Sequence, residues 1–559
     1  MAGTILTPNA IWKNFSISEK IGAENVGEFS IDGVVFNSLN VEGRAVKDGC
    51  VNIYAEFASK SQGSIAPAIL LLQDFEDNDR KLAINLVKQG YSVLLVDLAG
   101  YSEGKENYTQ YPESISYANY QKVKDGLSDV KGDVRETCWF EWCAVTRYAL
   151  KYLKSLPQVT AVGGFGVGKA ATVMWHVAGT DDGLDCAVFA LNAGWGGYNK
   201  IFKFAGTVEP QFSDDMYKFI AGVDAQSYAT HVTCPVLMLS ATNSDIFDVD
   251  RAFDTVSRIN QEIYSAVHYS VGHIDSVNYS AYKNALSFYK KFLLNSNAQL
   301  PEEIEVKCDV KDSKIVIEVG ADKENLTGVY AYVSEELADP SLRVWQKISD
   351  KKRDGDKFVF NYQPMPESEQ VIIFAEAEYR GGFTICSNVI CKKFKADELS
   401  AIYKSNIVYS SRNQDAESVF GPAKGSEENP ANVNVFDKGE VRVRKGPMGI
   451  EGVTCSGGLL TFKVASRRFK PSDGAMLMLD VYTKESTILT VKLITDYFGN
   501  KNEYLARVKV LGGDVWHNVM LECSKFKTEE GLPLKSYEKI QALSIDVDGE
   551  YLINNALWV

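Results

Sequence analysis

The stretch VTAVGGFGVGKAATVMWHVAG, residues 159–179, decides the fold of the N-terminal half of this chain. A short apolar run leads into the small-residue segment Gly164-Phe165-Gly166-Val167-Gly168, and an apolar segment of helical length follows. A strand that turns at once into a helix needs small residues where the two elements approach each other. The stretch therefore predicts a tight strand-to-helix turn centred on Gly166.

Continuous apolar runs on both sides of this stretch predict further strands that are buried on both faces. Helical stretches alternate with these runs, for example residues 79–90 and 138–156, and this alternation is typical of a parallel sheet with helices on both faces. The segment 28–57 alternates apolar and polar residues, as antiparallel hairpins do. We therefore expect an α/β domain over residues 1–299, and its buried strands include residues 68–73, 91–97, 186–191 and 234–240.

The C-terminal half has a different pattern. Residues 300–396 contain short alternating runs and no helical period, which predicts a β-sandwich. The polar segment 397–434 is typical of a linker. Alternating runs resume over residues 435–559 and predict a second all-β sandwich of jelly-roll size.

The composition restricts the partners of the protein. A formal net charge of −14 without clustered Lys and Arg argues against binding to nucleic acid or to an anionic membrane. No apolar run approaches the roughly 18 residues of a membrane helix, and the first residues lack a signal pattern, so we expect a cytoplasmic protein. The ten cysteines are dispersed without a CxxC pair. We therefore expect no metal site, and no motif indicates a cofactor.

The turn at residues 164–168 can be compared with the G-x-S-x-G turn that carries the nucleophilic serine of α/β hydrolases, and Gly166 then stands where the serine is missing. The acid of such a site follows the next-to-last strand, where Asp245 stands, with Asp248 as the alternative. The base follows the last strand, where His273 stands. The sequence thus predicts an acid and a base without the hydroxyl that attacks.

The segment YSVLLVDLAGYSEGK, residues 91–105, resembles the D-x-x-G-x-x-x-G turn after the fourth strand of α/β hydrolases. Together with the turn at 164–168 and the motifs ATNSD and GHI, it makes residues 30–296 similar to the dienelactone hydrolase and acetyl xylan esterase group. This resemblance implies a Ser-His-Asp mechanism and a small ester or acylated carbohydrate as ligand. The two later domains are similar to an Ig-like sandwich and to a galactose-binding-type jelly roll, which implies a glycan or protein partner for the last domain.

The acidic loop QDFEDND, residues 73–79, follows the predicted third strand. In this fold such a loop supplies a backbone N–H for the oxyanion, so Asp74, Phe75 and Val167 are the candidate oxyanion and turn residues. Carboxylates that face the site would oppose a developing negative charge. Carboxylates that face solvent would have no effect, and the sequence leaves both orientations open.

The segment near residues 105–137 is longer than a plain crossover and rich in tyrosine, which predicts a cap over the site. Tyr108, Tyr111 and Tyr117 are candidate pocket residues because tyrosine combines an apolar face with a polar tip. Packing of the cap itself is the alternative explanation for them.

Three functions are compatible with these observations. The first is a degenerate esterase that acts as a binding or scaffold protein. The second is an active carboxylesterase or deacetylase family in which residue 166 has been altered in this chain. The third is a carbohydrate-recognition or structural assembly protein in which the two β domains carry the function.

Overall fold

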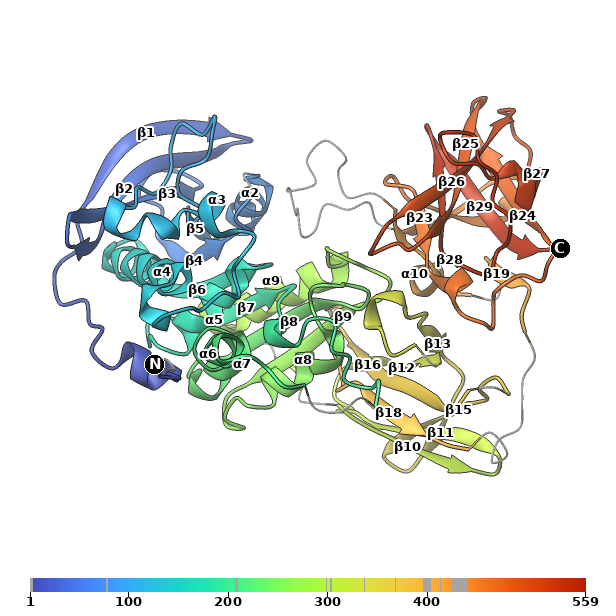
Figure 1. Ribbon diagram of the computed structural model, residues 1–559, viewed down its shortest axis with the longest axis horizontal. Coiled ribbons are helices and arrows are strands. Elements are labelled where there is room, and N and C mark those ends of the chain that lie inside the picture. Colours follow the sequence, from blue (N-terminus) through green and yellow to red (C-terminus); the bar gives the residue numbers. More distant parts are fainter. Residues whose placement is uncertain are drawn as a thin grey trace.

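The computed structural model describes residues 4–76, 79–206, 210–297, 299–301, 304–335, 337–366, 368–395, 404–412, 414–423 and 441–559. Figure 1 shows an α/β unit at the N-terminal end, followed by two units built of strands. Within these residues no helix is both long enough and apolar enough to cross a membrane.

The α/β unit is built on a nine-stranded sheet with the strand order β1-β2-β3-β5-β4-β6-β7-β8-β9. The first three strands and the β3–β5 pair are antiparallel, and β5, β4, β6, β7, β8 and β9 run parallel. The strands are β1 (Ala23–Ile31), β2 (Val34–Val46), β3 (Gly49–Ser59), β4 (Ala66–Leu72), β5 (Ser92–Val96), β6 (Val159–Val167), β7 (Cys186–Ala190), β8 (Val236–Ala241) and β9 (Ser265–Ser270).

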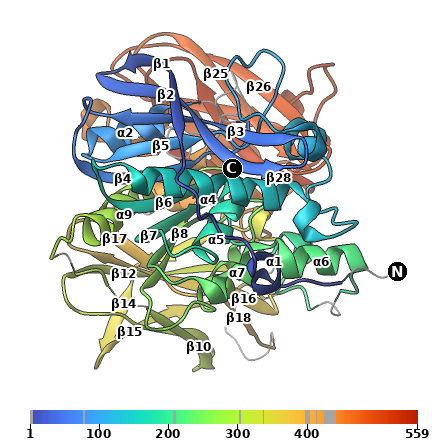
Figure 2. The ribbon, with the colours of Figure 1, turned by 90° about the vertical axis from the view of Figure 1, so that its left-hand side faces the viewer.

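Helices cover both faces of this sheet, as the alternation of runs predicts. In β4, Leu70 and Leu72 pack toward α4, α5 and α8, whereas Ile69 and Leu71 pack toward α2 and α9. Figure 2 shows α4 beside β4 and β6. The helices are α1 (Pro8–Trp12), α2 (Lys81–Lys88), α3 (Tyr120–Val123), α4 (Cys138–Ser155), α5 (Ala170–Ala178), α6 (Asp214–Gly222), α7 (Ala225–Tyr228), α8 (Val249–Val256) and α9 (Tyr279–Leu293).

The second unit contains two antiparallel sheets whose side chains share one core, for example Ile317 and Ile373. One sheet has the order β10-β11-β15-β14, and the other has the order β13-β12-β16-β17 with β18 beside β16. The strands are β10 (Glu305–Lys311), β11 (Lys314–Gly320), β12 (Leu326–Glu335), β13 (Gln346–Ile348), β14 (Lys351–Asp354), β15 (Lys357–Tyr362), β16 (Gln370–Tyr379), β17 (Phe383–Cys386) and β18 (Ile390–Lys393).

The third unit also contains two antiparallel sheets, and Leu479 and Val491 from the two sheets meet in its core. Their orders are β21-β22-β29-β24-β27, with β19 beside β29, and β20-β23-β28-β25-β26. The elements are β19 (Ile407–Ser410), α10 (Ala416–Val419), β20 (Gly421–Pro422), β21 (Arg442–Lys445), β22 (Glu451–Thr454), β23 (Leu459–Thr461), β24 (Met476–Thr483), β25 (Thr487–Thr495), β26 (Asn502–Val510), β27 (His517–Glu522), β28 (Ile540–Val547) and β29 (Tyr551–Trp558).

Part of the predicted linker, residues 397–434, belongs to the third unit. The short strands β19 and β20 lie inside that range and pair with β29 and β23. The sequence conceals them because each is short and flanked by polar residues. Residues 397–403, 413 and 424–434 of the predicted linker lie outside the described residues.

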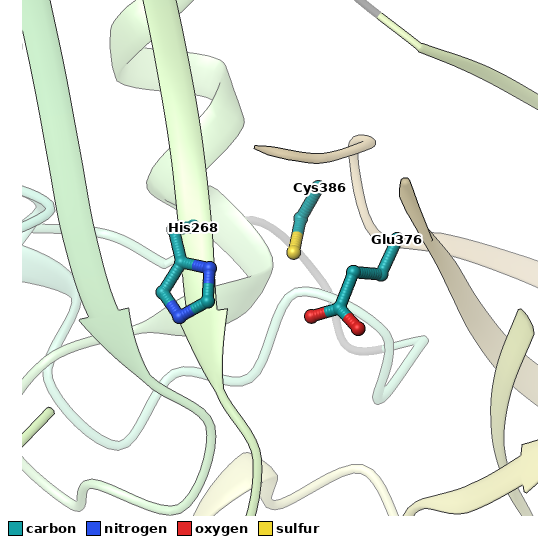
Figure 3. Close-up of side chains that lie close together, drawn as sticks. All are labelled: His268, Glu376 and Cys386. Atoms are coloured by element: carbon teal, nitrogen blue, oxygen red, sulfur yellow. The ribbon is translucent and has the colours of Figure 1, made fainter. Parts of the chain in front are cut away.

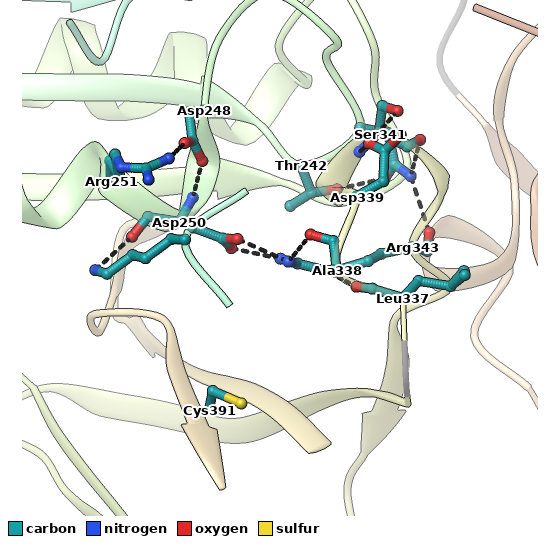
Figure 4. A network of polar contacts seen from close by, with 12 residues as sticks. Thr242, Asp248, Asp250, Arg251, Leu337, Ala338, Asp339, Ser341, Arg343 and Cys391 are labelled. Atoms are coloured by element: carbon teal, nitrogen blue, oxygen red, sulfur yellow. Dashed lines mark hydrogen bonds and ion pairs between the residues drawn. The ribbon is translucent and has the colours of Figure 1, made fainter. Parts of the chain in front are cut away.

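A buried ion pair joins the α/β unit to the second unit. Arg343 and Asp250 are both fully buried, and Arg343 Nη2 donates to Asp250 Oδ2 at 2.7 Å while Nη1 contacts the other oxygen. Arg343 also donates to the carbonyl oxygens of Leu337 and Ala338, at 2.9 and 2.8 Å. Figure 4 shows this network. Each nitrogen of the guanidinium therefore has a partner, and the pair ties residues of the second unit to the start of α8.

Candidate functional site

The strand-to-helix turn lies two residues beyond its predicted position. Gly166 is part of β6 and stands in register with Leu72 of β4 and Phe189 of β7. The left-handed backbone of the turn belongs to Gly168, with φ +57°, and α5 begins at Ala170. The prediction that Gly166 occupies the turn is therefore wrong, because small residues recur at the same spacing and the sequence fits both registers.

Gly166 has a packing role instead. A Cβ atom at this position would lie 2.7 Å from Ala171 Cα and from Met174 Cβ, closer than such atoms approach in proteins. Glycine thus allows α5 to lie directly against β6, which is one of the functions of small residues in such a turn.

The carboxylate of Asp74 occupies the space beside the turn. A Cβ atom built on Gly168 would overlap Asp74 Oδ2. The same oxygen accepts the backbone N–H of Lys169 at 3.0 Å, and Oδ1 accepts the backbone N–H of Phe75 at 2.8 Å. Burial raises the pKa of Asp74, and the N–H and the charge of Lys169 oppose this shift. Of the two orientations that the sequence leaves open, Asp74 adopts the inward one.

The turn is held from its other sides as well. The Gly168 N–H donates to Ala190 O at 2.9 Å, and Asn192 Nδ2 donates to Gly168 O at 3.0 Å. The ring of Phe75 stacks on Tyr120 with centroids 4.7 Å apart, and Lys169 Nζ donates to the Tyr120 hydroxyl at 3.1 Å. Packed side chains therefore cover the turn.

Among the candidate oxyanion residues, Asp74 and Phe75 lie at the turn, whereas Val167 is the last residue of β6. The N–H at the position expected for Val167 comes from Lys169, which follows the turn. The sequence does not single out Lys169, because the role of this residue depends on whether the turn lies at Gly166 or at Gly168. Residues 77 and 78 of the acidic loop lie outside the described residues.

The predicted acid and base line different cavities. Asp245 is exposed and lines a cavity of about 260 Å³. His273 lines a cavity of about 570 Å³, and its Nδ1 lies 3.1 Å from Ser276 Oγ. Asp74, beside the turn, lines a third cavity of about 320 Å³.

The alternative acid, Asp248, has a structural role. It precedes α8, where its Oδ1 accepts the N–H of Asp250 at 3.0 Å, and its other oxygen pairs with Arg251 (Figure 4). A side chain that caps a helix and neutralises an arginine is held by both contacts.

The cap tyrosines are used in packing. Tyr111 donates to Leu98 O at 2.9 Å, Tyr117 donates to Glu141 Oε1 at 3.5 Å, and Tyr108 packs edge-on against Tyr101. The residues of this segment that line the cavity at Asp74 are Lys105, Glu106 and Asn107. Packing of the cap, the alternative explanation, accounts for the three tyrosine contacts, and the pocket role of Tyr108, Tyr111 and Tyr117 stays a prediction.

A cavity that the sequence did not predict lies beyond the carboxyl ends of β7 and β8, where ligands of parallel sheets bind. It is the cavity of Asp245, and all three units contribute to it: Trp195, Asp339 and Phe498 lie in the first, second and third unit. Three of its lining residues, Trp195, Lys200 and Asp496, have φ of +65°, +61° and +51°. Such backbone is unfavourable for residues other than glycine and clusters at functional sites.

The structure also gathers a set of metal-binding residue types, although the sequence predicts no metal site. Ligand atoms of His268, Glu376 and Cys386 lie within 4.8 Å of one another, and all three residues are buried. The spacing along the chain gives no sign of this cluster, because its members belong to two units.

Comparison with known proteins finds similar folds only for part of the chain. No protein-family model and no curated protein matches the sequence. The chain is similar to the acetyl xylan esterase from Paenibacillus sp. R4, with 12% identity over 51% of this chain and 92% of that one, and a TM-score of 0.39. It is also similar to acetyl xylan esterase 1 from Thermoanaerobacterium sp. JW/SL YS485, with 14% identity over 53% and 96% and a TM-score of 0.37. The glucuronoyl esterase from Solibacter usitatus gives 12% identity over 51% and 90% and a TM-score of 0.35.

Proposed function

We propose that the α/β unit is an esterase-type α/β-hydrolase domain that has lost ester hydrolysis and serves to bind a ligand. The observation that carries this proposal is the carboxylate of Asp74 beside Gly168. In α/β hydrolases the nucleophile stands at the strained turn, and the N–H of the next residue and an N–H after the third strand bind the oxyanion. The corresponding positions here are Gly168, Lys169 and Phe75.

This arrangement opposes catalysis twice. Gly168 supplies no attacking atom, and the two N–H groups already bind the Asp74 carboxylate. Loss of a single oxyanion donor costs about 10²–10³ in turnover, and a carboxylate among the donors adds repulsion toward the developing charge. A serine at residue 168 alone would overlap Asp74, so one substitution is not expected to restore the site.

A double-mutant cycle tests this arrangement. We expect Gly168→Ser to destabilise the protein by about 1–3 kcal/mol through overpacking. Asp74→Ala in the same chain is expected to recover the part of that loss that comes from the overlap, while the strain of serine at a φ of +57° persists. Urea unfolding of the two single variants and the double variant measures the coupling between the positions. Neither the wild-type chain nor Gly168→Ser is expected to hydrolyse p-nitrophenyl acetate above the rate of heat-unfolded protein.

Gly166→Ser is the matched control, because its side chain would meet Ala171 and Met174 of α5 rather than Asp74. It is expected to be destabilised with or without Asp74→Ala. If residue 166 alone had been altered in an active enzyme, Gly166→Ser would instead restore hydrolysis. Saturable hydrolysis by the wild-type chain, or independent effects at residues 74 and 168, would contradict the proposal.

The cavity of Asp245 supports a carbohydrate ligand, esterified or not. Trp195 and Tyr198 contribute aromatic rings to its lining, with Arg258 over the first ring and Arg251 over the second. Asp245, Asp339 and Gln541 contribute polar groups for hydroxyls. This cavity is a better candidate sugar site than the last unit by itself. In that unit Trp558 is buried in the core, and Trp516 Nε1 donates to Pro447 O.

Affinity electrophoresis of the full chain in gels with acetylated xylan, deacetylated xylan or no polysaccharide tests this ligand class. We expect retardation of the wild-type chain, and loss of at least half of it in Trp195→Ala and in Asp245→Asn. Trp516→Ala is the control and is expected to migrate as the wild type. Loss of retardation in Trp516→Ala alone would assign binding to the last unit, and unretarded wild type in both polysaccharides would refute a xylan ligand.

A further inference from the structure

We propose that His268, Glu376 and Cys386 form a zinc site that joins the α/β unit to the second unit. His268 lies on β9, Glu376 on β16 and Cys386 at the end of β17. Figure 3 shows the three side chains directed toward a common space. The proposal is independent of whether the α/β unit hydrolyses esters.

The donor set is the first argument. One imidazole, one thiolate and one carboxylate are ligands that Zn²⁺ binds at about 2.0–2.3 Å with tetrahedral geometry. The ligand atoms lie within 4.8 Å of one another, and a tetrahedral ion would bring them to roughly 3–4 Å. The three residues converge from β9 of one sheet and from the paired strands β16 and β17 of another.

The histidine is oriented for coordination by its second nitrogen. His268 Nε2 lies 3.1 Å from Asn278 Oδ1, an oxygen that also accepts the N–H of Ala281, so Nε2 carries the hydrogen. A metal-bound histidine commonly donates its other N–H to such an oxygen. Nδ1 then carries the lone pair of the ring, and this lone pair accepts from the Thr384 hydroxyl at 2.7 Å. Zinc would replace that hydroxyl, which keeps its contact with Asn284.

The burial of Glu376 is the second argument. This carboxylate is 7% exposed, and its hydrogen bond among the described residues comes from the Tyr332 hydroxyl at a long 3.3 Å. The nearby Lys347 forms its ion pair with Asp415 at 2.8 Å. Burial of a carboxylate is costly without a direct cation or several donors. A metal ion in the space between Glu376 and Cys386 would offset this cost.

An entry path is also present. His268, Glu376 and Thr384 line the cavity of about 570 Å³ at the junction of the three units. An ion can therefore reach the cluster from this cavity, and a water molecule in it can supply the fourth ligand. Because the ligands come from two units, bound zinc would couple the folding of these units.

The full chain, stripped with EDTA and dialysed, is titrated with Zn²⁺, and bound metal is measured by elemental analysis. We expect one zinc per chain. Co²⁺ in its place is expected to give a near-ultraviolet thiolate charge-transfer band. Cys386→Ser should abolish this band, and both Cys386→Ser and Glu376→Gln should lower the affinity at least tenfold.

Two controls separate this site from other thiols. Cys391→Ser removes a half-buried thiol on β18 of the same unit, and Cys50→Ser removes an exposed one. We expect zinc to raise the Tm of the wild-type chain. Both control variants are expected to bind zinc and to show the same rise in Tm. A wild-type chain that binds no zinc would refute the site, as would unchanged affinity in Cys386→Ser or Glu376→Gln. The Glu376→Gln variant keeps the shape of the side chain, so it decides the matter if Cys386→Ser does not fold.

Discussion

Arg343→Met is expected to lower the free energy of unfolding by about 3–5 kcal/mol. The substitution removes the cation but leaves Asp250, whose side chain is fully buried, without its partner. Urea unfolding followed by tryptophan fluorescence and by circular dichroism measures the effect. Because the chain has several units, the two probes need not coincide, and the transition of the α/β unit and its neighbour should shift together.

The control for this prediction is Arg135→Met, which removes a pair with Asp133 on the surface. Exposed pairs contribute about 0–1 kcal/mol. The double variant Arg343→Met/Asp250→Leu removes both buried charges and is expected to be more stable than Arg343→Met alone. A loss below about 1 kcal/mol in Arg343→Met would mean that water reaches Asp250.

Lys463→Met is expected to stabilise the third unit at neutral pH. Lys463 is 4% exposed, and burial lowers the pKa of its ammonium group to about 7, with the charge of Arg468 acting in the same direction. Its Nζ donates to Val408 O at 2.6 Å. The unfolded chain keeps its proton up to about pH 10.4. Folding therefore buries a charged ammonium group below pH 7 and releases its proton between about pH 7 and 10.4.

The sign of the pH dependence follows from this difference. Because the folded-state pKa is lowered, the unfolded state binds more protons between about pH 7 and 10.4, and the wild-type chain gains stability as the pH rises through that window. The advantage of Lys463→Met, at most about 5 kcal/mol at pH 7, should therefore shrink by more than half near pH 9.5. Urea unfolding at both pH values measures it. Lys484→Met, at an exposed position, serves as the control, and a constant difference across the window would contradict the lowered pKa.

The sequence predicts the sheet better than the site. The buried strands and the order of their helices follow from continuous apolar runs, and the structure contains them close to the predicted ranges. The sequence predicts the turn two residues too early, because Gly164, Gly166 and Gly168 recur at every second position and fit either register. Only the pairing of Gly166 with Leu72 and Phe189 distinguishes strand from turn, and such pairing is a property of the fold.

The site residues depend on contacts between distant segments. The direction of the Asp74 side chain depends on the N–H of Lys169, which lies 95 residues away. The cavity of Asp245 is lined by residues of three units, and the cluster of His268, Glu376 and Cys386 has members in two units. Motifs report spacing along one segment, so they indicated where polar residues gather but not which of them meet.

Under the proposed loss of ester hydrolysis, the overlap between Asp74 and a side chain at residue 168 also restricts the order in which the two residues can change. The present orientation of Asp74 leaves no room for a Cβ atom at residue 168. A mutation that introduces serine at residue 168 meets the Asp74 carboxylate, and a mutation at residue 74 alone leaves two backbone N–H groups without their partner. Each single change is therefore expected to lower stability, so the two residues are expected to change together.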